Sequence, residues 1–387
     1  MTLATVAARS DGKYATTTPP RTALRHRSVG LADLGPNWFA GVMGTGIVAT
    51  AAVTLPVHVP GLRGFALAVW VLASFLLASL IYATAAQWLR HPVAARAHLN
   101  DPVMSHFYGA PPMAVLTVGA GAILVGRDVL GLRLAVDLDW VMWLIGTATG
   151  LAVAAVVPYV AFTRHDTKPD SAFGGWLMPV VPPMVSASTG ALLVPYAAAG
   201  QLRETLLAAC YCMFGLSLFA SVVIIGLIWG RLMQHKVGSP AAVPTLWIVL
   251  GPLGQSITAA GLMATAARGT LPTVDADGAA AMAMLFGLTT WGFAVLWLTV
   301  AIAVTARTAR AHLPFSLTWW SFAFPVGALV TGTNGLAVRT GLAFFAGASV
   351  LLYALLVLAW LTVSARTLSA IAMGTLPAPA VVGAREA

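Results

Sequence analysis

The chain has 387 residues, of which 59% are hydrophobic and only 9% are charged. A soluble domain carries about a quarter of its residues as charged side chains, so a water-facing surface cannot be built from this composition. The composition therefore excludes a soluble protein, and the solvent that suits the chain is lipid.

Ten mostly apolar stretches follow one another along the chain, each near the roughly 20 residues that a membrane-crossing helix needs. In order they are 37–57, 64–88, 107–126, 139–162, 174–195, 204–230, 243–267, 278–306, 316–336 and 340–364. The linkers are too short for a separate soluble domain. We therefore predict an all-α integral membrane protein with one ten-helix domain over 37–366, a disordered basic tail at 1–36 and a second tail at 367–387.

The basic residues predict the orientation, because Lys and Arg collect on the cytoplasmic side of a membrane protein. Ten spans place both tails on one side, and that side holds 15 of the 21 Lys and Arg residues. The opposite side holds only Arg63, Arg127, Arg133, Arg203, Arg268 and Arg339. Both termini are predicted to be cytoplasmic, in an inner or plasma membrane. No cleavable secretory signal is expected ahead of residue 37, and no dense basic cluster suggests nucleic-acid binding.

Prolines are unevenly distributed among the predicted spans. The odd-numbered stretches contain ten, and the even-numbered ones contain only Pro158. A proline inside a helix frees a carbonyl and kinks the helix, and the freed group must find protein or water rather than lipid. We predict five helical hairpins, each with a kinked odd helix in an inner pore ring and a straight even helix in an outer ring. The competing plan, an inverted repeat of five and five helices, would pair the first span with the proline-free sixth.

Titratable side chains are expected to lie outside the span centres, which speaks against a carboxylate-coupled carrier, a cation pathway and a membrane hydrolase. Cys210 and Cys212 stand two residues apart on one predicted helix and therefore point to different faces. They have no further ligands nearby for a metal. We predict that the protein is not an enzyme and that it has no cofactor or metal. A weakly polar, uncharged lining suits an anion, for which hydroxyl and amide groups are donors.

Candidate pore-lining residues are the polar residues of the odd-numbered spans and the glycines and proline that interrupt their regular helix. They are Gly44, Thr45, Gly46, Pro183, Ser186, Gln255, Ser256 and Thr331. Each has a plainer interpretation, namely close helix packing, a structural bend or an interhelical hydrogen bond. In the ninth span, Phe324 precedes Pro325 and is therefore biased away from helical geometry. An aromatic ring at such a point is either a core residue or a plug in a pore.

The chain resembles the tellurite-resistance/dicarboxylate transporter family, which includes malic acid transporters, fungal sulfite pumps and plant guard-cell slow anion channels. The segments that carry the resemblance are Trp38-Phe39 with Met43 through Ala49, Asp101-Pro102-Val103 leading to Phe107, Trp176 through Pro183, and Trp319-Trp320 through Phe324-Pro325. The chain lacks the long cytoplasmic tails of the plant channels, so kinase gating is not implied.

The resemblance implies five inner helices around a pore, a homotrimer, and a phenylalanine of the ninth helix that occludes the pore. The matching residue is Phe324, with Phe322 as the alternative. The implied function is transport of a small anion, with C4-dicarboxylate first and sulfite, tellurite or inorganic anions next. Two alternatives remain: a five-plus-five drug/metabolite-type exporter, and a membrane scaffold subunit without transport.

Overall fold

The computed structural model describes residues 30–375, so most of the two predicted tails (residues 1–29 and 376–387) lies outside the described residues. Within the described range the only regular secondary structure is helical, and there is no strand. Eight helical stretches are long and apolar enough to cross a membrane: Leu62–Arg90, Met104–Leu130, Leu132–Arg164, Gln201–His235, Pro240–Ala267, Thr273–Ala311, Leu317–Thr340 and Ala343–Ala372. The protein is thus a multi-pass membrane protein.

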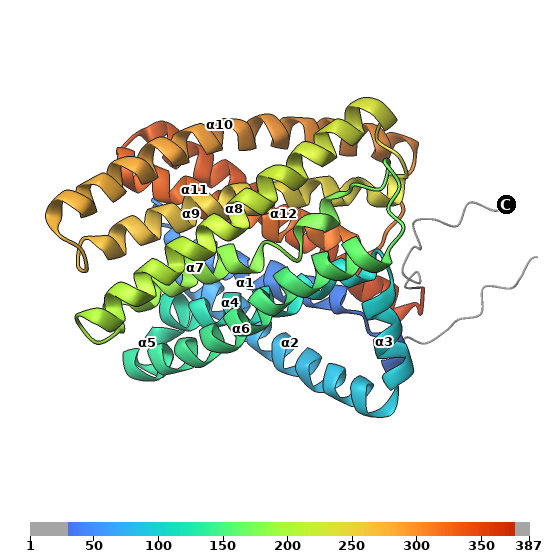
Figure 1. Ribbon diagram of the computed structural model, residues 1–387, viewed down its shortest axis with the longest axis horizontal. Coiled ribbons are helices and arrows are strands. Elements are labelled where there is room, and N and C mark those ends of the chain that lie inside the picture. The colour runs from blue at the N-terminus through green and yellow to red at the C-terminus, as the bar shows by residue number, and fades with distance from the viewer. Residues whose placement is uncertain (1–29, 376–387) are drawn as a thin grey trace, which may run out of the picture.

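Five long helices are mostly exposed: α2 (Leu62–Arg90), α6 (Leu132–Arg164), α8 (Gln201–His235), α10 (Thr273–Ala311) and α12 (Ala343–Ala372). In each of them only 28% to 33% of the most apolar 18-residue window is buried. Their surfaces carry large apolar side chains such as Phe75, Phe162 and Phe219. In a membrane these faces meet lipid. Figure 1 shows α10 along one edge of the molecule and α2 along the opposite edge.

Five shorter helices are buried: α1 (Phe39–Thr54), α4 (Ala110–Gly121), α7 (Pro182–Leu193), α9 (Leu250–Ala267) and α11 (Phe324–Thr340). Their neighbours include 3₁₀ segments, of which η7 (Pro240–Val249) and η8 (Leu317–Phe322) lead directly into α9 and almost directly into α11. Of 16 residues in α1, 13 are buried, and so are 11 of the 12 in α7. With 16 and 12 residues, these two helices are too short to count among the eight candidate spans.

Several prolines of the predicted inner helices lie in the first turn of an α-helix, where a proline needs no kink within that helix. Pro111 and Pro112 stand in the first turn of α4, Pro182 and Pro183 begin α7, and Pro325 is the second residue of α11. A first-turn residue has no intrahelical acceptor for its N–H, so proline is tolerated there. The three prolines near residue 180 therefore mark the entry to α7.

One acidic residue is buried within a membrane-spanning helix, whereas the sequence was expected to offer no carboxylate inside the membrane. The sequence placed Asp139 at the edge of a span, but α6 begins seven residues earlier at Leu132 and buries Asp139 completely. Both carboxyl oxygens lack a hydrogen-bond partner within the described residues, and a Cβ on Gly119 of α4 would lie 2.7 Å from one of them. The sequence missed this because the seven preceding residues include Arg133 and Asp137, which looked like a loop.

Tryptophans of the long helices tie the outer layer to the buried helices. The indole N–H of Trp70 donates to the Val118 carbonyl (3.0 Å), that of Trp143 to the Ser186 carbonyl (2.9 Å), and that of Trp297 to the Leu246 carbonyl (2.8 Å). Trp360 of α12 donates to the Thr45 hydroxyl at 3.1 Å. Each bond satisfies a polar group that lipid cannot satisfy, while the ring fills space between the layers.

Candidate functional site

Two cavities lie among the buried helices. The larger one has both polar and apolar lining residues and is called the polar cavity below, after its polar residues; the other is small and apolar. The larger has a volume of about 850 Å³ and is lined largely by the later residues of the buried helices. Its polar lining consists of Thr50, Thr54, Thr117, Ser188, Thr189, Gln255, Thr258, Thr265, Thr331 and Asn334, with Arg268 and Arg339. No acidic residue of the described chain is part of this lining. The lining therefore offers hydroxyl, amide and guanidinium groups, all of which can donate to an anion.

The smaller cavity lies among earlier residues of the same helices and the 3₁₀ segments that precede them. It has a volume of about 20 Å³, roughly the room that one water molecule needs. Its lining is almost wholly apolar, with Met43, Phe107, Met113, Met178 and Val181 among its residues. An ion cannot pass through a space of this size with its hydration shell, so the described conformation is closed at this level.

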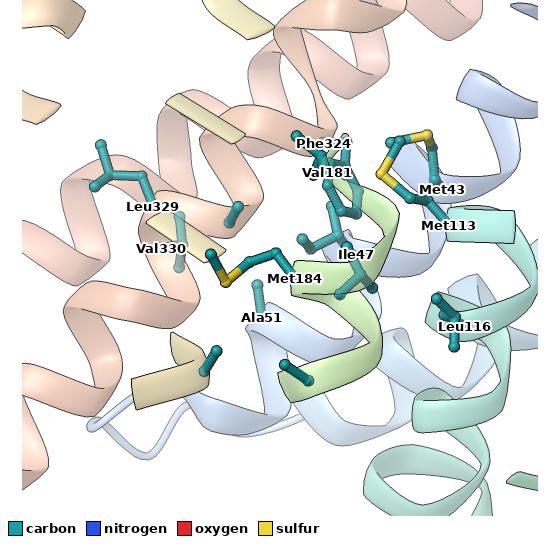
Figure 2. Close-up of a cluster of buried hydrophobic side chains, with 14 of the residues drawn as sticks. Met43, Ile47, Ala51, Met113, Leu116, Val181, Met184, Phe324, Leu329 and Val330 are labelled. Atoms are coloured by element: carbon teal, nitrogen blue, oxygen red, sulfur yellow. The ribbon is translucent and has the colours of Figure 1, made fainter. Parts of the chain in front are cut away.

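Phe324 is the one described residue that lines both cavities. Its side chain is 4% exposed and lies at the start of α11, where the 3₁₀ segment η8 gives way to the α-helix. Figure 2 shows it in a cluster of buried apolar side chains that includes Ile47, Val181 and Met184. Phe324 is thus a buried residue shared by the linings of the two cavities.

Phe322 lies in a different environment and lines neither cavity. Its ring packs edge-on against Trp247, with centroids 5.1 Å apart, and against Trp319, at 5.8 Å. These aromatic pairs account for its position through packing alone.

Hydrogen bonds connect the polar side chains of the larger cavity across helix boundaries. Gln255 of α9 donates to the hydroxyl of Ser188 of α7, and Thr258 and Thr331 share a hydrogen bond at 2.8 Å between α9 and α11. The Asn334 amide donates to the Thr54 hydroxyl at 3.0 Å, and its carbonyl oxygen has no partner within the described residues. Because a hydroxyl rotates to suit its neighbour, these groups are able to turn their hydrogens toward a solute.

Three of the ten residues proposed from sequence line the larger cavity: Gln255, Thr331 and Phe324. The α1 residues face protein instead. Thr45 donates to the Gly41 carbonyl at 2.7 Å and accepts from Trp360. A Cβ on Gly44 would lie 3.0 Å from Ala323, and one on Gly46 would lie 2.8 Å from the Thr117 methyl group. On α1 the two glycines therefore allow close helix packing.

Pro183, Ser186 and Ser256 are buried but line neither cavity. The Ser186 carbonyl accepts from the Trp143 indole, and the Ser256 hydroxyl donates to the Leu253 carbonyl at 2.8 Å. Sequence reasoning missed most of the actual polar lining. A signal existed, since Thr50 and Thr54, or Thr331 and Asn334, recur at the three- and four-residue spacing that shares one helix face. Nothing in the sequence alone says which face meets a cavity.

A multi-pass helical protein whose buried helices line a polar cavity, closed at one end by apolar side chains, has the construction of a membrane transporter or channel. A family model described as voltage-dependent anion channel matches residues 33–368, and the chain belongs to this family of anion transporters and channels. The resemblance to the tellurite-resistance/dicarboxylate transporter family is thereby confirmed.

Curated relatives carry several different names. A sulfite efflux pump of Trichophyton rubrum is 27% identical over 323 residues, which cover 82% of this chain and 85% of the relative. An uncharacterized transporter of Methanocaldococcus jannaschii is 28% identical, with 77% and 82% covered. The malic acid transport protein of Schizosaccharomyces pombe is 21% identical, with 75% and 67% covered.

Proposed function

We propose that the protein carries a small anion across a membrane, through the larger cavity and past Phe324. The observation that carries this proposal is the position of Phe324, the one described side chain common to the polar cavity and the apolar one. A phenyl ring in such a constriction blocks an ion sterically and also keeps water out, so a shift of the ring is enough to gate the path. Phe322, held by Trp247 and Trp319, is the weaker candidate for the gate.

The charges of the cavity favour an anion over a cation. Two arginines and several hydroxyl groups contribute to its lining, and no carboxylate of the described chain does. A cation path through a membrane protein usually carries acidic side chains or rings of carbonyl groups. Asp139, the buried carboxyl of α6, does not line either cavity and so does not alter this balance.

We propose sulfite as the first substrate to test, ahead of the C4-dicarboxylate that the sequence ranked first. Sulfite efflux pumps cover more of the chain, at 27% identity, than the malic acid transport protein does at 21%. A C4-dicarboxylate such as malate stays the second candidate, because a cavity of about 850 Å³ is large enough for it and one relative is named for malic acid. Tellurite and other inorganic anions follow.

Purified protein in liposomes provides the test. Entry of sulfite, malate, nitrate, chloride and tellurite is measured against empty liposomes, with an impermeant sugar as a leak control and a potassium gradient that sets the membrane potential. Selective entry of sulfite or malate supports the proposal, and the order of the two rates decides between them. Equal rates for all five anions and the sugar, or rates no higher than in empty liposomes, would overturn it.

The arrangement of the spans belongs to the same proposal. We propose ten membrane crossings in five hairpins, with α1, α4, α7, α9 and α11 as the inner ring, both termini in the cytoplasm, and three copies in the assembly. The alternation of buried and exposed helices supports the rings, and the excess of basic residues in alternate loops supports the orientation. Reporter fusions at the two termini and the mass of the purified complex test these points separately. Membership of the anion channel family argues against the exporter and scaffold alternatives.

A further inference from the structure

Two arginines stand at the end of the larger cavity that is remote from Phe324. Arg339 lies in the last turn of α11, and Arg268 directly follows the last residue of α9. Both line the cavity. Fifteen residues separate Phe324 from Arg339, which is about 22 Å along a helix axis. The arginines and the phenyl ring thus lie near opposite ends of one polar space.

Arg339 is held in place by its contacts with α9. One terminal nitrogen of its guanidinium donates to the Gly261 carbonyl and, at 2.8 Å, to the Thr265 hydroxyl. A Cβ on Gly261 would lie 3.3 to 3.4 Å from guanidinium nitrogens, so the absence of a side chain there lets the group lie close to the helix. A guanidinium has five N–H donors, and these bonds use only some of them. The remaining donors are fixed in direction by the same contacts.

Within residues 30–375, no acidic side chain forms an ion pair with Arg268 or Arg339. Both arginine side chains line the same cavity, so their positive charges face one space. The ion pairs seen between described residues, Arg63–Asp128 and Arg127–Asp128, include neither of these two arginines. The ends of α9 and α11 offset part of the charge, because a helix C-terminus carries roughly half a negative charge. Two such ends offset about one of the two positive charges, so a net positive field remains.

We propose that Arg268 and Arg339 form a binding site for a small oxyanion or carboxylate, which collects the anion at this end of the cavity before it reaches Phe324. The proposal rests on the function proposed above. A planar guanidinium matches two oxygens of sulfite or of a carboxylate. From the arginines, the hydroxyls of Thr265, Thr258 and Thr331 lead along α9 and α11 toward the phenyl ring.

A lipid phosphate has the same chemistry as a free oxyanion. It is a second source of the same group at this site, because exposed residues of α10, Ala281 and Met284, line the cavity and α10 faces lipid along most of its length. We assign the arginine site to the transported anion, because the cavity lining is continuous from the arginines to Phe324. A lipid headgroup is therefore an outcome that the experiment has to distinguish.

Arg268→Gln is the informative variant, since Arg268 is exposed and lines the cavity, and its side chain makes no hydrogen bond or ion pair in the described structure. Its replacement leaves the Arg339 contacts intact. Arg133→Gln is the matched control, because Arg133 is exposed, is predicted to lie on the same side of the membrane, and lines neither cavity. Arg339→Lys keeps a charge at the second position and loses the planar group.

The measurement is thermal unfolding of the purified protein in lipid-free detergent across a sulfite titration at constant ionic strength, which gives an apparent Kd without any transport step. We expect Arg268→Gln to raise that Kd about fivefold to tenfold, while Arg133→Gln leaves it unchanged; a tenfold loss corresponds to about 1.4 kcal/mol. Equal Kd values for the wild type and Arg268→Gln would overturn the site. Stabilisation by added phosphatidylglycerol, with none by sulfite, would assign the arginines to lipid and also overturn it.

Flux measurements separate this proposal from the function on which it rests. If sulfite binding depends on Arg268 but the protein shows no anion flux, the binding site is supported and the proposed transport function is refuted. If both hold, Arg268→Gln should raise the half-saturating sulfite concentration for entry from the arginine side, with little change from the opposite side. Equal effects from both sides would refute the role of the pair in collecting the anion.

Discussion

Replacing Phe324 by alanine separates a gate from a core residue. Truncation of a phenylalanine in a tightly packed core costs about 3–5 kcal/mol of folding free energy, because the surroundings cannot fill the space. Phe324 is as buried as such a residue, at 4% exposure, and it also belongs to the linings of both cavities. The polar cavity can therefore supply water to the vacated space. We expect a loss of stability below about 3 kcal/mol.

The same substitution should widen the path where the two cavities meet. Ile47, Val181 and Met184 remain around the gap, so the opening is expected to be partial. A gain in anion flux of about tenfold corresponds to a barrier lowered by about 1.4 kcal/mol. Flux is measured in liposomes and divided by the amount of folded protein, which is determined by size-exclusion chromatography of the re-extracted sample. Phe324→Leu, with a smaller but still apolar side chain, should give an intermediate gain.

Phe322→Ala is the matched control. It removes the edge-on contacts with Trp247 and Trp319, each worth about 0.5–1.5 kcal/mol beyond burial, and it opens no cavity. It should lower stability without raising flux. If Phe322→Ala alone gave a higher flux, the gate would be assigned to Phe322 instead of Phe324. A folded Phe324→Ala protein with unchanged or lower flux would refute the reasoning for both residues.

Three further predictions concern the cavity and the packing around it. Single cysteines at Thr258, Thr331 or Asn334, in a protein that lacks Cys210 and Cys212, should react with a water-soluble thiol reagent. Single cysteines at Thr45 or Ser186 should not react. Equal labelling of the two sets would contradict the assigned lining. Asn334→Asp places a carboxylate in the polar cavity and should lower anion flux at least about tenfold relative to Asn334→Ala. A tenfold loss corresponds to a barrier raised by about 1.4 kcal/mol. Similar rates in the two variants would show that anions avoid this position. Gly254→Ala would bring a Cβ to 2.3 Å from the Leu329 nitrogen and should destabilise the protein by about 1–3 kcal/mol or more, whereas Gly292→Ala, with nothing within 4 Å, should be close to neutral in thermal unfolding.

The membrane class could be predicted from composition, because 9% charged residues leave no choice of solvent. The order of the helices also followed from apolar length, and the proline count distinguished buried from exposed helices even though the physical reason was different. Prolines mark the inner helices because those helices start from tight, irregular segments, as at Pro182 and Pro325. The same residues were expected to bend helices from within. A composition bias can thus identify the right elements through a mechanism that was not the expected one.

The cavity lining was harder to predict, because the polarity of a residue does not tell whether its side chain points into a cavity or against a neighbouring helix. Thr45 looks as suitable for a pore as Thr50, but Trp360 of α12 occupies its hydroxyl, and that contact links residues 315 positions apart. Asn334 appeared in the sequence beside Thr331 without any sign that Thr54 would be its partner. In the sequence, Arg268 and Arg339 contributed only to the prediction of how the protein is oriented in the membrane. Their convergence depends on the packing of α9 against α11 through Gly254, which no local pattern reveals.

The 3₁₀ segments around the buried helices have a consequence for length. A 3₁₀ residue advances about 2.0 Å along the axis, against about 1.5 Å in an α-helix. The ten residues of η7 therefore reach about 20 Å, some 5 Å farther than the same residues would in an α-helix. Inner helices can in this way match the thickness of the bilayer with fewer residues than their straight neighbours. Rewinding η7 by a few residues between the two forms would also slide its end by about an ångström, since the two forms differ by about 0.5 Å per residue.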